Sequence, residues 1–111
     1  MMETARRRAE MLRRWREFVC VVAEAVRRVL GDADVYVFGS VVSGDSVASS
    51  DVDVLVVSDR VPESMLERGA LKVEIERAAG LPVYHPFELH IVRSEEAEHY
   101  FTKIGRNILK I

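Results

Sequence analysis

Apolar residues in the first third of the chain recur at spacings of three and four, which is the pattern of one face of an α-helix. The set comprises Met11, Leu12, Trp15, Phe18, Val19, Val22, Val26, Val29 and Leu30. Gly31 follows the last of them, and a glycine at this place commonly ends a helix. The pattern therefore predicts a helix over residues 4–30.

Three shorter segments have the alternating pattern of a β-strand. Residues 34–38 read DVYVF and residues 87–92 read FELHIV, and both alternate in β-branched and aromatic residues. Residues 51–58 read DVDVLVVS, and their apolar run is typical of a strand that is buried along most of its length. On the third strand, Glu88 and His90 share one face because side chains two apart point the same way.

The remaining segments are read as one loop and two further helices. Residues 41–50 are rich in Ser, Gly and Asp, which favour turns, so we expect a loop there. Pro62 suits the first turn of a helix that Gly80 interrupts, and Ser94 resembles the start of another. The apolar side of this last helix is predicted to consist of Ala97, Phe101, Ile104 and Ile108.

The order of elements is then helix, strand, strand, helix, strand, helix. Such an order predicts a single domain over residues 1–111 of the α/β (α+β) class, with helices packed on a small mixed sheet. A composition of 49% hydrophobic and 31% charged residues supports a packed core rather than intrinsic disorder.

Composition narrows the setting further. Cys20 is the one cysteine, which excludes an internal disulfide and a metal site built of several thiolates. No apolar stretch approaches the roughly 20 residues that a membrane span needs. The first residues also lack the apolar segment of a secretory signal. We therefore expect a cytoplasmic protein with no membrane partner.

Charge is divided unevenly along the chain. Residues 1–30 carry eight basic and four acidic side chains, whereas residues 31–111 carry eight and fourteen. A basic helix can bind nucleic acid, but the acids interleaved at Glu10, Glu17 and Glu24 favour a solvated helix face. Nucleic-acid binding is the weaker interpretation.

The segment of residues 38–57, FGSVVSGDSVASSDVDVLVV, carries the candidate chemistry. Asp51 and Asp53 are two apart at a strand start, so both carboxylates project from one face about 7 Å apart. Carboxylate oxygens suit a hard cation such as Mg²⁺, which commonly also binds substrate phosphates. Gly39 lets a ligand approach the backbone, and the Ser40 hydroxyl can donate to phosphate oxygens. Together they favour phosphoryl or nucleotidyl transfer, although an aspartate pair alone is more often a solvated turn.

The spacing of this segment resembles the signature of the minimal nucleotidyltransferases, in the DNA polymerase beta superfamily. The matching run is Gly39, Ser40, three residues, Gly44, five residues, and then Ser50, Asp51, Val52 and Asp53. The resemblance implies a small mixed α/β fold that covers nearly the whole chain. It also implies two Mg²⁺ ions, and transfer of a nucleoside monophosphate from a nucleoside triphosphate, with ATP expected, to an acceptor hydroxyl.

The resemblance assigns roles to individual residues. Asp51 and Asp53 match the first two catalytic carboxylates and metal ligands, and Glu88 is the candidate for the third, where the family usually has Asp. The nucleotide-binding positions are Gly39, Ser40, Gly44 and Ser50. The family often carries a basic residue just before the second glycine, where this chain has Ser43.

Several alternatives stay open at this point. The resemblance suggests a HEPN protein of a toxin–antitoxin pair as partner, with this chain as the antitoxin that adenylylates or masks it. The main rival is a binding protein with a decayed site, and a third is a structural domain that only binds a cation. His90 fits a metal ligand, a base or a structural histidine. The apolar run of residues 108–111 is expected to be exposed and to favour contact with a partner or an identical chain.

Overall fold

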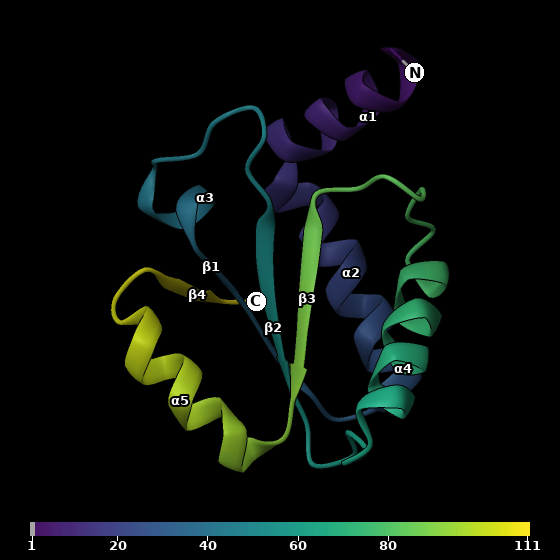
Figure 1. Cartoon of the computed structure of the whole chain (residues 1–111), viewed down its shortest axis with the longest axis vertical. Helices are drawn as coiled ribbons and strands as arrows, with labels where there is room; N and C mark the ends of the chain where they lie inside the picture. The colour runs from purple at the N-terminus through teal and green to yellow at the C-terminus, as the bar shows by residue number, and fades with distance from the viewer. Residues whose placement is uncertain (1) are drawn as a thin grey trace.

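The computed structural model describes residues 2–111. Its elements, in chain order, are α1 (Met2–Arg13), α2 (Trp15–Leu30), β1 (Asp34–Phe38), α3 (Ser40–Ser43), β2 (Val52–Val57), α4 (Met65–Ala78), β3 (Phe87–Val92), α5 (Ser94–Ile104) and β4 (Ile108–Lys110). The strands form one mixed sheet in the order β3-β2-β1-β4 (Figure 1). Only the β2 and β3 pair is parallel. The expected α/β class with a small mixed sheet is confirmed.

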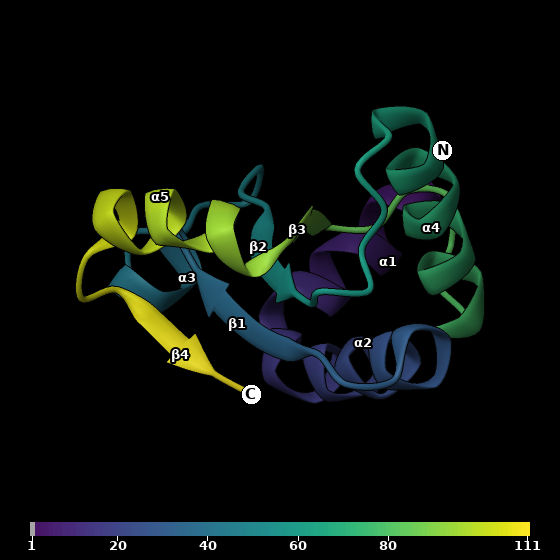
Figure 2. The same cartoon turned by 90° about the horizontal axis from the view of Figure 1, so that it is seen from below.

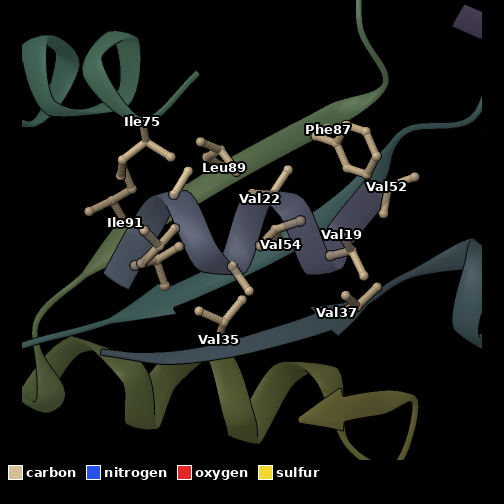
Figure 3. Packing of buried hydrophobic residues seen from close by; sticks show 14 of the residues in the cluster. Val19, Val22, Val35, Val37, Val52, Val54, Ile75, Phe87, Leu89 and Ile91 are labelled. Atoms are coloured by element: carbon tan, nitrogen blue, oxygen red, sulfur yellow. The ribbon is translucent and has the colours of Figure 1, made fainter. Parts of the chain in front are cut away.

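Helices cover both faces of this sheet, with α2 on one side and α5 on the other (Figure 2). On the α2 side, Val19 and Val22 of the helix lie over Val35, Val37 and Val54 of the strands (Figure 3). A side chain of this kind contributes about 1.5–3 kcal/mol when it is fully buried. Successive side chains of the strands therefore point alternately into two cores, one on each face of the sheet.

The α5 side holds a smaller and more aromatic core. Leu55, Val92 and Ala97 are buried there, and Tyr36, Phe38, Val57, Tyr100 and Phe101 pack against them. Because β2 alternates, Val52, Val54 and Val56 face α2 while Asp53 and Leu55 face α5. Asp53, the second residue of β2, therefore lies on the aromatic side of the sheet.

The single helix expected over residues 4–30 is wrong, because the chain bends at Arg14. Arg14 has φ −103° and ψ 30° and lies between two separate helices. Arg14 is neither glycine nor proline, the residues that usually kink a helix, and the apolar spacing continues past it. The sequence therefore gives no local signal of a break there. The bend turns α1 away from the axis of α2 (Figure 1) and brings Arg8 against residues 48–51.

Two central segments also differ from their predictions. Residues 40–43 of the expected loop form a helical turn, α3, which ends at Gly44 in the left-handed conformation. Helix α4 begins after Ser64, whose hydroxyl accepts from the Glu67 amide, and not in the turn of Pro62. Gly69 lies within α4 and does not interrupt it.

Ile108 was predicted on the last helix, but it belongs to β4 instead. Helix α5 ends before Gly105, and the chain then pairs β4 with β1 in antiparallel register. The run of residues 108–111 is therefore not a free apolar end: Ile111 packs against the core, and Leu109 is 42% exposed. Sheet pairing between residues far apart in sequence decided this, and a short apolar run does not encode it.

Among residues 2–111, no helix combines the length and apolar character required to cross a bilayer.

Candidate functional site

The candidate site lies where β1 ends and β2 begins. Asp53 pairs with Phe38 of β1 on one side and with Glu88 of β3 on the other. Residues in register on neighbouring strands point to the same face, so Glu88 lies on a strand next to Asp53 and on the same face of the sheet. The Asp53 side chain is half-buried, and Glu88 is exposed.

Gly39 is shaped by its contact with Asp53. It has φ +89°, a conformation that L-residues with a side chain rarely adopt, and a Cβ there would collide with Oδ2 of Asp53. The carboxylate therefore sits directly against the backbone of Gly39. This explains why a glycine follows β1.

The next residues form a compact turn. The amides of Val42 and Ser43 both donate to the carbonyl of Gly39 at 3.1 Å, and the amides of Gly44 and Asp45 donate to that of Ser40 at 3.0 Å. The turn places Ser40 one residue after the Gly39 that contacts Asp53. Ser50 closes the following loop, since its hydroxyl accepts from the Val47 amide at 2.8 Å. The nucleotide-binding roles of Gly39, Ser40, Gly44 and Ser50 stay predictions.

Asp51 lies just before β2 and contacts a residue that the sequence did not single out. Its Oδ1 accepts from Nη2 of Arg8 at 2.8 Å, and the same nitrogen donates to the Ser50 carbonyl at 3.0 Å. Nη1 of Arg8 reaches the Ala48 carbonyl at 3.4 Å. Arg8 is one of three consecutive arginines, so charge alone did not separate it from Arg6 and Arg7.

His90 is placed beside the site rather than deep in a core. Its Nε2 lies 3.2 Å from Oδ1 of Asp53, and its ring centroid is 5.2 Å from that of Phe38 and 5.7 Å from that of Tyr100. The pair with Asp53 fixes one carboxylate oxygen, and the aromatic rings hold the imidazole in place. A groove of about 370 Å³ opens next to His90, between α4 and α5.

The donor set fits a hard divalent cation in its chemistry. Asp53 and Glu88 lie in register near the starts of β2 and β3, and Asp51 directly precedes β2. Their carboxylate oxygens are of the kind that Mg²⁺ prefers. Among residues 2–111, however, no three His, Cys, Asp or Glu side chains lie close enough together to hold a metal ion in their present positions. Asp51 is turned to Arg8 and Asp53 to His90. The metal role of the three carboxylates stays a prediction.

Comparison with known proteins gives a consistent assignment. A model of the nucleotidyltransferase domain family matches residues 19–108. A crystal structure of a protein assigned as a nucleotidyltransferase shares 30% identity with a TM-score of 0.58, over 81% of this chain and 92% of that one.

A second crystal structure, of a protein from Sulfolobus solfataricus that is also assigned as a nucleotidyltransferase, has the same fold. Its TM-score is 0.55 at 20% identity, over 98% of this chain and 83% of that one. No protein of curated function matches the chain by sequence. The domain match includes every residue of the run from Gly39 to Asp53, and the resemblance drawn from that run is confirmed. The chain belongs to the nucleotidyltransferase domain family.

Proposed function

We propose that the chain is a Mg²⁺-dependent nucleotidyltransferase that transfers a nucleoside monophosphate from ATP to an acceptor hydroxyl. The observation that carries the proposal is the placement of Asp53 against Gly39 and in register with Glu88. This arrangement places the candidate phosphate-binding residue Gly39 beside the carboxylates, where β1 ends and β2 begins. Family membership supports the same reaction class.

In this reaction the acceptor oxygen forms a bond to the α-phosphorus, the bond from that phosphorus to the bridging oxygen breaks so that pyrophosphate leaves, and the hydroxyl proton passes to solvent water. Asp51, Asp53 and Glu88 would hold the cations, which when bound neutralise phosphate charge and lower the pKa of the acceptor hydroxyl. Gly39 and Ser40 would hold phosphate oxygens. His90 fixes the Asp53 carboxylate through one of its oxygens, so the chain mainly positions groups and compensates charge.

Binding experiments test the site directly. Asp53→Asn should weaken binding of ATP in the presence of Mg²⁺ by about tenfold or more, which is the scale of one lost charge in a partly buried site. Asp51→Asn should have the same direction. Asp59→Asn is the control, because Asp59 is exposed beyond the opposite end of β2. Calorimetry with ATP, with and without Mg²⁺, measures the effect, and equal binding by all the variants would contradict the proposal.

The acceptor is proposed to be a partner protein, of the HEPN type that the sequence resemblance suggests, with this chain as its antitoxin. Incubation of that partner with radiolabelled ATP, Mg²⁺ and the chain should label the partner, and Asp53→Asn should abolish the label.

Self-association is proposed through the exposed edge of β4 at Leu109. Light scattering of the isolated chain should then show a dimer, and a monomer at high concentration would contradict this part.

The second candidate is a nucleotidyltransferase-fold protein with a decayed site that acts by masking its partner. Glu88 in place of the usual Asp and Ser43 in place of a basic residue favour it. It predicts tight partner binding that Asp53→Asn leaves unchanged, with no labelled product. The labelling experiment therefore separates the two functions.

A further inference from the structure

The candidate site carries a large excess of negative charge. Residues 38–57 include Asp45, Asp51 and Asp53 and contain no Lys or Arg, and Glu88 adds a fourth carboxylate from β3. A nucleoside triphosphate brings several further negative charges. Two divalent cations would balance only part of this total, so an additional positive group is needed for the nucleotide to bind well.

Arg8 is the arginine that the fold brings to this position. Its guanidinium reaches across 43 residues of sequence to Asp51 and also binds the carbonyls of Ala48 and Ser50. Its side chain is only 24% exposed, so the charge is partly shielded from water. A guanidinium has five N–H donors, and these three contacts leave two of them for a further acceptor.

We propose that Arg8 is a binding residue for the nucleotide's phosphates, and that it supplies from α1 the positive charge that the loop of residues 39–50 does not contain. The proposal rests on the proposed function and extends it to a residue before the matched family segment, since the domain match begins at residue 19. The bend at Arg14 is what permits this, because it turns α1 toward residues 48–51.

The charge of Arg8 acts in opposite directions on the two ligands. A guanidinium beside Asp51 repels a bare divalent cation and competes for the same carboxylate, so it weakens binding of the cation alone. It attracts the phosphates of a nucleotide, so it strengthens binding of the cation–nucleotide complex. Arg8 therefore makes the site accept cation and nucleotide together rather than the cation first.

The test uses the full chain and two probes: Mn²⁺ alone, followed by its electron paramagnetic resonance signal, and α,β-methylene ATP with Mg²⁺, followed by calorimetry. Arg8→Gln should bind Mn²⁺ about threefold to tenfold more tightly and the nucleotide about tenfold more weakly. Arg8→Lys keeps the charge, so its Mn²⁺ affinity should stay near that of the unaltered chain. Its nucleotide affinity should lie between those of the unaltered chain and of Arg8→Gln. Arg6→Gln, an equal change of charge at an exposed position of α1, should leave both affinities nearly unchanged.

The outcomes separate this inference from the function beneath it. Weaker binding of both probes by Arg8→Gln would show that Arg8 only braces the loop, and that result would overturn the proposal, as would no change in either. If Asp53→Asn weakens Mn²⁺ binding while Arg8→Gln changes nothing, the inference fails and the proposed function stands. If Asp53→Asn leaves both probes unaffected, the proposed function fails and Arg8 loses its role with it. Thermal unfolding of each variant establishes that the fold is intact.

Discussion

Gly39 shows how much of the site depends on a single residue. Its positive φ lets the chain turn directly from β1 into α3, and its missing side chain leaves room for the Asp53 carboxylate. The absence of a side chain at Gly39 therefore determines both the path of the backbone and the position of Asp53, a candidate metal ligand. The two consequences can be separated by experiment, because the chain has another glycine of positive φ outside the site, Gly80.

Gly39→Ala should destabilise the fold by about 1–3 kcal/mol, since the backbone conformation is strained for any L-residue with a side chain. It should also abolish Mg²⁺-dependent nucleotide binding, because the new methyl group displaces Asp53. The matched control is Gly80→Ala, outside the site, where φ is +69° and an added Cβ meets nothing within 4 Å. Urea unfolding and calorimetry should show strain in both variants and lost binding in the first alone; full binding by Gly39→Ala would contradict the assignment.

Among the elements, α5 is joined to α4 by an ion pair of one acidic side chain, Glu96. Glu96 accepts from the Arg93 amide at 3.0 Å, which caps its own helix, and pairs with Arg68 of α4 at 2.8 Å. The hydrogen bond from Arg68, followed by that from the Arg93 amide, lowers the pKa of Glu96 from its usual 4.5. The charged form is thus favoured in the folded state.

A lowered pKa in the folded state gives a defined pH dependence. The stabilisation is fully present above the usual value of 4.5 and is lost as pH falls through the lower folded pKa. Glu96→Gln should therefore cost up to about 1 kcal/mol at pH 7, a modest value for a partly exposed pair. The difference from the unaltered chain should shrink toward pH 3. Glu98→Gln, an exposed position of α5, is the control, and an equal cost at both pH values would contradict the role of Glu96.

At the scale of the whole molecule, α4 packs differently from its apolar pattern. Ile75 is fully buried, but Met65 is 75% and Leu66 is 86% exposed, so the apolar residues of this helix do not share one buried face. The position of α4 at one side of α2 decides which of them is covered (Figure 1). Apolar character by itself did not distinguish the buried residues from the exposed ones.

Truncation of the two kinds of residue should show the difference. Ile75→Ala should lower the free energy of unfolding by about 2–5 kcal/mol, because it leaves a cavity in the core. Leu66→Ala should change it by less than about 0.5 kcal/mol, as surface substitutions do. Guanidinium unfolding of both variants measures the contrast, and a similar cost for each would contradict the packing of α4.

What the sequence determined by itself is local. The strands of residues 34–38 and 87–92 were predicted with the bounds that the structure has, because alternation is a property of neighbouring residues. The run from Gly39 to Asp53 identified the family for the same reason, since its spacing lies within one connection between two strands. Tertiary structure decided the rest: the bend at Arg14, the pairing of β4 with β1 and the contact of Arg8 with Asp51. Each of these is stabilised by a partner that is distant in sequence, and a local pattern carries no record of which distant residue the fold will bring close.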